Sequence, residues 1–373
     1  MNILHLITSI NKGGAENHLA CLARGQVFKK NKVFVIFLKG NSYWKKYYSK
    51  IGIKVINLKN CGSGKAGILK RIFFLKNFFV KFNIDVVHAH LPHMELYSWL
   101  AIMLSNKKYK FIISKHVDND FIGGSNYKNN SIIASFVSYL ISKKASKVIA
   151  ISKAVKKYFS ESFFNIKSNK IKVIYYGIDN SYIKLLLNGK NKINIPKKKL
   201  IFGSIGRLVK QKNFELILQS FKIFLDKGSS DSLLVIAGSG PEEKNLKKFA
   251  QNIGINKSII WLGDVDKVGD ILKQIDVFCM NSRFEGLGLV MLEAMAFSKP
   301  IIAPRISAIP EVVKNNVNGI LVKKNSLKDY SNAMLKISQK NYIRKFSKKS
   351  KTILIKKFNF DKMINKTQKI YLN

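Results

Sequence analysis

The chain has 373 residues, of which 47% are hydrophobic, and a formal net charge of +45 at pH 7. This length suggests two domains of about 100 to 200 residues each, and the hydrophobic content excludes an intrinsically disordered chain. Cys21, Cys61 and Cys279 are far apart and lack C-x-x-C spacing, which excludes zinc-finger chemistry and favours a reducing compartment.

The first half alternates short β-branched runs with longer segments of helical period. The predicted strands are Asn2–Thr8, Lys32–Leu38, Ile53–Leu58, Ile84–Ala89, Lys110–Ser114, Lys147–Ile151 and Lys172–Tyr176. The predicted helices are Glu16–Phe28, Ile68–Phe82, Met94–Leu104, Ile132–Lys143 and Lys153–Phe159. Such alternation is typical of βαβ units and a parallel sheet. The N-terminus lacks the pattern of a signal peptide, and no segment reaches the ~18 apolar residues of a membrane span.

The segment Asn188–Lys199 contains turn formers, a proline and a run of lysines, so we expect it to be an interdomain linker. The same alternation then starts again and predicts a second doubly wound domain. Its predicted strands are Leu200–Ile205, Ser232–Ala237, Ser258–Leu262, Asp276–Met280, Pro300–Ala303 and Ile320–Val322. Its predicted helices are Phe214–Leu225, Glu242–Asn252, Val268–Gln274 and the helix of the segment that begins at Glu285, and two basic helices end the chain.

The net charge has three interpretations at this stage: a nucleic-acid partner, an anionic membrane surface, or a compositional bias toward Lys, Asn and Ile. The basic residues are spread along the chain and form no recognisable nucleic-acid motif, so we expect no nucleic-acid partner. Two stretches, Arg71–Phe82 and Ile132–Lys144, interleave Phe, Leu and Ile with Lys. Such helices either lie on an anionic bilayer or pack their apolar side on the sheet.

Candidate site residues in the first half follow predicted strands. Gly13 and Gly14 precede a helix, where they either allow a ligand to approach the backbone or form a tight turn. His116 ends a strand and precedes the loop VDNDFIGG, which is where α/β sheets place functional groups; the alternative is a histidine capped by that loop. The trio His88, His90 and His93 raises the question of a metal site, but no cysteine or carboxylate cluster accompanies it, and we expect no metal.

The second half offers polar groups at several predicted strand ends. Arg207 and Lys212 lie five residues apart after one strand, which suits a pyrophosphate; the alternative is a solvated loop. The remaining candidates also either contact a ligand or form turns at this edge of the sheet: Gly238, Gly240, Asp264 and Asp266.

The segment Glu285–Pro300, EGLGLVMLEAMAFSKP, predicts a helix that is apolar on every side and therefore buried. Its carboxylate Glu293 is costly to bury unless hydrogen bonds or a ligand satisfy it. Gly286 and Gly288 precede the helix, where free backbone N–H groups favour an anion. The sequence thus predicts an anion site at a helix N-terminus with Glu285 just before it.

These motifs resemble the retaining nucleotide-sugar glycosyltransferases of family four, which have the GT-B fold. The resemblance rests on GRLVKQKN, VIAGSGPE, WLGDVD and the Glu-x7-Glu run in the second half, and on GGAE, HAHLPH and VIYYGID in the first. It implies two Rossmann-like domains facing across a cleft. We expect an acceptor domain at 1–187, joined by a C-terminal helix at 358–373 that crosses back to it, a linker at 188–199, and a donor domain at 200–357.

The resemblance also implies residue roles. Arg207 and Lys212 would bind the diphosphate, Glu293 the ribose hydroxyls, and Glu285 would lie beside the transferred sugar. His116 would lie near the donor sugar, with Gly13 and Gly14 meeting the phosphates. The backbone of the helix start would face sugar and phosphate through Gly286, Leu287, Gly288, Leu289 and Val290.

The expected function is a metal-independent, cofactor-free retaining glycosyltransferase that uses a nucleotide-sugar, UDP- before GDP-, and a glycan or lipid-linked acceptor of bacterial surface polysaccharide synthesis. We expect a cytoplasmic protein, with docking on the inner face of the membrane as one interpretation of its charge. The alternatives are an epimerase or phosphorylase of the same fold, although no pyridoxal lysine is evident, and a basic nucleic-acid-binding protein.

Overall fold

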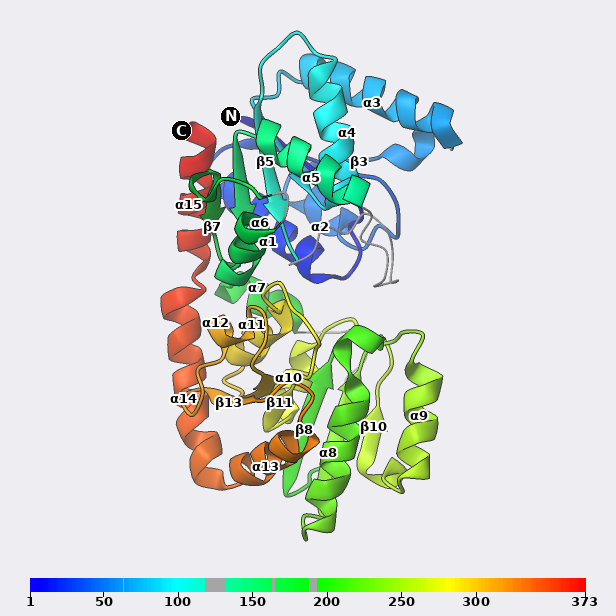
Figure 1. Cartoon of the computed structure of the whole chain (residues 1–373), viewed down its shortest axis with the longest axis vertical. Coiled ribbons are helices and arrows are strands. Elements are labelled where there is room, and N and C mark those ends of the chain that lie inside the picture. Colours follow the sequence, from blue (N-terminus) through cyan, green and yellow to red (C-terminus); the bar gives the residue numbers. More distant parts are fainter. Residues whose placement is uncertain (63, 118–131, 163–164, 188–192) are drawn as a thin grey trace. The chain divides into compact units, whose positions relative to one another are not determined.

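The computed structural model describes residues 1–62, 64–117, 132–162, 165–187 and 193–373. It divides into two compact units, Met1–Gly177 with Phe360–Asn373, and Ile178–Asn359. Each unit alternates strands and helices around one sheet (Figure 1). This confirms the predicted α/β class with two Rossmann-like domains. The loop predicted to follow His116, from residue 118 on, and residues 188–192 of the predicted linker lie outside the described residues.

The first unit contains a seven-stranded parallel sheet with the order β3-β2-β1-β4-β5-β6-β7. Its strands are β1 Asn2–Ile7, β2 Lys32–Phe37, β3 Lys54–Asn57, β4 Val86–His90, β5 Lys110–Lys115, β6 Lys147–Ala150 and β7 Ile171–Val173. Its helices are α1 Gly14–Phe28, α2 Lys45–Lys50, α3 Gly64–Lys81, α4 Pro92–Met103, α5 Ile132–Lys144, α6 Lys153–Glu161 and α15 Phe360–Leu372. The central strands are buried along nearly their whole length, as expected for a parallel sheet covered on both faces.

The second unit contains a six-stranded parallel sheet with the order β10-β9-β8-β11-β12-β13. Its strands are β8 Leu200–Ile205, β9 Ser232–Ala237, β10 Ile259–Trp261, β11 Val277–Cys279, β12 Ile301–Pro304 and β13 Gly319–Val322. Its helices are α7 Asn180–Leu186, α8 Phe214–Asp226, α9 Glu243–Asn252, α10 Gly269–Gln274, α11 Leu289–Ala296, α12 Ile309–Val312, α13 Leu327–Ile337 and α14 Lys340–Lys357. Stacked and edge-to-face phenylalanines from β8 and α8 fill its core: Phe202, Phe221 and Phe224.

The strand order of each sheet reverses at one point. In the first sheet β1 has β2 on one side and β4 on the other, and in the second β8 lies between β9 and β11. The loops after such a central pair diverge to opposite faces, which opens a crevice at the carboxyl ends of the strands. The segments after β8 and β11 are the places where the second unit is expected to bind a ligand.

The boundary between the units lies after Gly177, ten residues before the predicted end of the first domain. The reason is that α7 packs on α10 of the second unit and buries Tyr182 and Leu186. At the other end α15 begins at Phe360 and packs on α1, where a Cβ at Gly25 would lie 2.2 Å from Ile364 Cδ1. The C-terminal helix thus belongs to the first unit.

Candidate functional site

Two loops meet at the reversal point of the second sheet. The loop after β8 contains Gln211, whose backbone carbonyl accepts a hydrogen bond from the Arg283 N–H at 2.7 Å. The Gln211 side chain donates in turn to the Phe284 carbonyl at 3.0 Å. These bonds join the loop of the predicted cations to the loop that precedes α11, so residues predicted from separate motifs lie side by side.

Lys212 and Glu285 form an ion pair where these loops meet. Their side chains are 18% and 10% exposed, and the Ser282 hydroxyl donates to the same oxygen, Glu285 Oε1, at 2.8 Å. Ser282 is itself buried. A largely buried carboxylate needs such partners, and the pair therefore fixes both charged groups in this structure.

Arg207 lies on the same loop, five residues before Lys212, and its side chain is exposed. It follows Gly206, whose φ of 158° lies at the edge of the range that favours glycine. The loop after β8 thus contains a paired cation, Lys212, and an exposed cation, Arg207. Their joint contact with an anion stays a prediction.

Gly238 and Gly240 allow the loop after β9 to pack directly on the loop after β8. A Cβ at Gly238 would lie 2.0 Å from the Gly206 carbonyl oxygen, and one at Gly240 would lie 2.4 Å from the carbonyl oxygen of Leu208. The structure thus gives these glycines a packing role, and their contact with a ligand stays a prediction. Asp264 is exposed after the edge strand β10, two strands away from the reversal point.

Helix α11 begins after Gly288, which adopts a left-handed conformation with φ 79°. A Cβ there would lie 2.6 Å from Met291 Cε. Glycine is therefore favoured at this position both by the left-handed backbone and by the lack of space for a side chain. The helix is buried on nearly all sides, as predicted. Around its start Gly286, Leu287, Gly288 and Leu289 are buried and Val290 is half-buried.

Glu293 is 5% exposed on α11 and accepts a hydrogen bond from the Tyr182 hydroxyl at 2.5 Å. The sequence indicated that this carboxylate needs a donor but not which residue supplies it. Tyr182 lies 111 positions away in a segment that was predicted to belong to the other domain.

In the first unit Gly13 is the N-cap of α1, in an extended conformation. A Cβ at Gly13 would lie 2.3 Å from Glu16 Oε2, and the Ser9 hydroxyl donates to Glu16 Oε1 at 2.6 Å. The Glu16 carboxylate therefore lies over the start of α1, beside Gly13 and Gly14. The predicted phosphate contact of these glycines stays a prediction.

His116 follows β5 and is buried, with both ring nitrogens hydrogen-bonded. Its Nδ1 lies 2.7 Å from the Tyr176 hydroxyl and its Nε2 lies 3.1 Å from His90 Nδ1. Burial lowers the pKa of His116 to about 3, so the ring is neutral near pH 7. In this arrangement the imidazole has no ring nitrogen left for a substrate.

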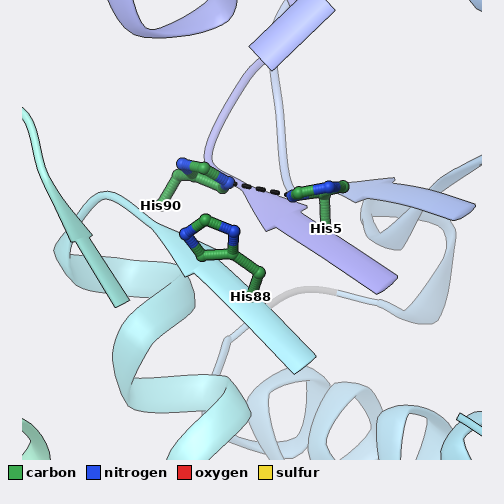
Figure 2. Close-up of side chains that lie close together, drawn as sticks. All are labelled: His5, His88 and His90. Atoms are coloured by element: carbon green, nitrogen blue, oxygen red, sulfur yellow. Dashed lines mark hydrogen bonds between the residues drawn. The ribbon is translucent and has the colours of Figure 1, made fainter. Parts of the chain in front are cut away.

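Three further histidines of the first unit, His5, His88 and His90, turn toward one another from β1 and β4 (Figure 2). His5 Nδ1 and His90 Nε2 are 3.1 Å apart, and the rings of His88 and His90 have centroids 4.2 Å apart. Each of the six ring nitrogens has a hydrogen-bond partner among the described residues. His5, and not His93 of the sequence motif, lies with His88 and His90 in this group.

The hydrogen bonds define one consistent direction along these rings. His5 Nε2 donates to Gln26 Oε1, which can only accept, at 2.7 Å. A neutral imidazole has one donor and one acceptor, so His90 Nε2 donates to His5, His116 Nε2 donates to His90, and Tyr176 donates to His116. A buried chain of hydrogen bonds thus holds His116 in one tautomer.

The same chain extends to the C-terminal helix. The Gln26 amide donates to the Tyr371 hydroxyl at 3.0 Å, and that hydroxyl lies 2.6 Å from His88 Nδ1. His88 Nε2 lies 2.7 Å from the Ser114 hydroxyl. All these groups are buried, so the network ties α15 to the sheet.

Both halves of the chain match known family models. Residues 12–182 match the Glycosyltransferase Family 4 model, and residues 188–353 match the model of glycosyl transferases group 1. An uncharacterized glycosyltransferase of Methanocaldococcus jannaschii, MJ1069, is 31% identical over 81% of this chain and 77% of its own length. A UDP-Gal:alpha-D-GlcNAc-diphosphoundecaprenol alpha-1,3-galactosyltransferase of Escherichia coli is 24% identical over 82% of this chain and 79% of its own.

A solved structure of Anabaena Alr3699/HepE, in complex with UDP and glucose, shares the fold. Its TM-score is 0.82, at 18% identity, over 98% of both chains. The parallel sheets, the loops at the reversal point and the match of both halves lead to one conclusion: the chain is a glycosyltransferase of family 4 with the GT-B fold.

Proposed function

We propose that this glycosyltransferase moves a sugar from a UDP-sugar to a lipid-linked glycan acceptor in the synthesis of a bacterial surface polysaccharide such as O-antigen, capsule or exopolysaccharide. The observation that carries the donor assignment is the ion pair of Lys212 with Glu285 at the reversal point of the second sheet, with Arg207 exposed on the same loop as Lys212. UDP is supported by the UDP-containing structure of similar fold and by the UDP-Gal-dependent relative. The same relative acts on a diphosphoundecaprenol-linked acceptor.

The proposed reaction keeps the anomeric configuration and needs no metal ion. The bond between the anomeric carbon and the diphosphate oxygen breaks, the oxygen of the acceptor hydroxyl forms the new bond on the same face, and the hydroxyl proton goes to the departing diphosphate. Arg207, Lys212 and the N-terminus of α11 stabilise the negative charge that grows on the diphosphate. Glu285 lies beside the sugar and Glu293 binds the ribose, so the two carboxylates serve different parts of one donor.

The donor assignment predicts a selective thermal stabilisation. A UDP-sugar at about 100 times its dissociation constant adds ~2.7 kcal/mol of stability, which shifts the melting temperature by roughly 5 to 10 °C for units of this size. Differential scanning fluorimetry with UDP- and GDP-sugars measures it, and release of UDP in the presence of a lipid-linked acceptor checks turnover. Stabilisation by GDP-sugars alone would overturn the assignment of uracil as the donor base. Stabilisation by neither kind of sugar would overturn the assignment of the donor site.

Three neighbouring helices of the first unit, α3, α4 and α5, have exposed apolar side chains, and α3 and α5 also have exposed lysines. Helix α3 packs on α4 and α4 packs on α5. Their exposed apolar side chains are Ile68, Leu69, Phe73, Val80, Met103, Leu104, Ile133 and Phe136. The exposed lysines of α3 and α5 include Lys70, Lys81, Lys143 and Lys144. Among the described helices none is both long and apolar enough to cross a bilayer. We propose that this surface docks on an anionic membrane face, where the lipid-linked acceptor lies.

Membrane docking predicts that the protein sediments with anionic vesicles and is released by salt, because each lysine near the surface contributes about 1 kcal/mol. We expect at least tenfold tighter binding to phosphatidylglycerol vesicles than to phosphatidylcholine vesicles. Phe73→Glu should weaken binding severalfold. Ile355→Glu, at an equally exposed apolar position of α14 in the second unit, serves as the control. Equal binding to both kinds of vesicle would remove the docking proposal.

A further inference from the structure

Helix α7 belongs to the second unit and packs on α10, although it precedes the first strand of that unit. A Cβ at Gly269 of α10 would lie 2.5 Å from the Leu186 carbonyl oxygen, so glycine is required for this close approach. At the other end of α7 the Asp179 side chain accepts a hydrogen bond from the Tyr182 backbone N–H at 2.9 Å. The backbone of Tyr182 is therefore fixed from both ends of a short helix.

The side chain of Tyr182 is equally well defined. It is 1% exposed, and its hydroxyl donates to Glu293 Oε1 at 2.5 Å. This distance is typical of a charge-assisted O–H···O⁻ bond, which is about twice as strong as a neutral one. A carboxylate as buried as Glu293 otherwise costs several kcal/mol. The bond therefore keeps the carboxylate buried and sets the direction of one of its oxygens before any ligand arrives.

We propose that Tyr182 is a positioning residue for the donor: its hydroxyl orients the Glu293 carboxylate toward the vicinal hydroxyls of the donor ribose. The inference rests on the proposed role of Glu293 and adds to it a residue from outside the donor motifs. Preorganisation by a rigid tyrosine reduces the ordering cost of binding. Its effect is confined to the ribose, because the diphosphate is assigned to Arg207 and Lys212 on another loop.

The test compares ligands that differ only at the ribose. Calorimetric titration with UDP, 2′,3′-dideoxy-UDP and pyrophosphate is carried out on the wild-type protein and on Tyr182→Phe, which keeps the ring. We expect Tyr182→Phe to weaken UDP binding about tenfold, to leave pyrophosphate binding unchanged, and to reduce the preference for UDP over its dideoxy analogue. Glu293→Gln should reduce that preference at least as strongly.

Tyr330→Phe is the matched control, because Tyr330 is also fully buried and its hydroxyl donates to the Met280 carbonyl at 3.2 Å. This variant loses a buried hydrogen bond of the same unit without touching Glu293, and it should keep the ribose preference. A loss of ribose preference of equal size in Tyr330→Phe would reduce Tyr182 to a structural role and overturn the inference.

Two outcomes separate the inference from the proposed function. If Glu293→Gln loses the ribose preference and Tyr182→Phe keeps it, Tyr182 is not a positioning residue and the donor site stands. If Glu293→Gln itself keeps the preference, the assignment of Glu293 fails and the inference falls with it.

Hydrogen exchange of the wild-type protein gives a measurement that needs no variant. UDP, but not pyrophosphate, should slow exchange in residues 180–186, and equal effects of both ligands would contradict the inference.

Discussion

A Lys212→Met variant is expected to lose about 100- to 1,000-fold in kcat/KM and about 3 kcal/mol in stability. On the proposed donor assignment, the catalytic loss follows from the removal of a preorganised positive charge beside the departing diphosphate. The stability loss has a different cause, because the substitution leaves the carboxylate of Glu285 buried without its cation. We place the stability cost at the low end for buried pairs because the Lys212 side chain remains 18% exposed.

The double variant Lys212→Met with Glu285→Gln separates the two effects. The glutamine carries no charge and can still accept the hydrogen bond from Ser282. Removing both charges of a buried pair is close to neutral, so stability should return to within about 1 kcal/mol of the wild-type value. Activity should not return, because the cation proposed to face the diphosphate and the carboxylate proposed to lie beside the sugar are both missing.

Urea unfolding of the second unit and initial rates with a saturating acceptor measure these two quantities on the same preparations. Lys222→Met provides the control, since Lys222 forms an exposed i,i+4 pair with Asp226 on α8 and such pairs contribute little. Recovery of activity in the double variant would show that neither charged group acts on the donor. Full activity in Lys212→Met would remove it from the donor site.

The sequence was sufficient to predict the strands that precede the proposed donor site. The predicted strands Leu200–Ile205 and Ser232–Ala237 coincide with β8 and β9, and each is followed by a glycine, whereas Asp276–Met280 is longer than β11. Because carboxyl ends of parallel strands share one edge, Lys212 and Glu285 could be expected on the same edge before any coordinates. That they form an ion pair was not predicted, since spacing along the chain does not determine which side chains meet.

Other features depend on contacts between distant segments and left no periodic signal. The bond from Tyr182 to Glu293 crosses 111 positions. The compact units divide after Gly177, ten residues before the predicted domain end at residue 187, because the prediction followed the lysine run near residue 197 and not the short helix α7. The histidines are a similar case. The HAHLPH motif drew attention to His93, whereas the register of β1 against β4 places His5 directly beside His88.

Acidification is expected to unfold the first unit near pH 5 and to leave the second unit folded. All six histidines lie in the first unit. Burial lowers the pKa of His5 to about 4 and of His116 to about 3, and it lowers the pKa values of His18, His88 and His90 well below 6.5. The second unit contains no histidine, so it lacks this source of acid sensitivity.

The direction follows from proton linkage. Between pH 6.5 and about 4 these five histidines are protonated in the unfolded chain and neutral in the folded one, so unfolding takes up protons and stability falls as the pH falls. Each such group contributes up to about 1.36 kcal/mol per pH unit, and five give roughly 5 kcal/mol or more per unit. Since domain stabilities are about 5–15 kcal/mol, one to two pH units below 6.5 are enough for unfolding.

Pulsed hydrogen exchange at stepped pH values, resolved by peptide, distinguishes the units. His18→Phe tests the cause, because the His18 ring stacks on that of Tyr176 with centroids 4.1 Å apart and its buried Nδ1 has no hydrogen-bond partner among the residues that the structure describes. This variant removes one titrating group and leaves the chain of hydrogen bonds intact, so proton uptake on unfolding should fall by about one and the midpoint should move to lower pH. His93 is only half-buried, and His93→Gln should change the midpoint much less. Stability that stays constant from pH 7 to pH 5 would mean that the folded chain accommodates charged imidazoles, contrary to the neutral network from Tyr176 to Ser114.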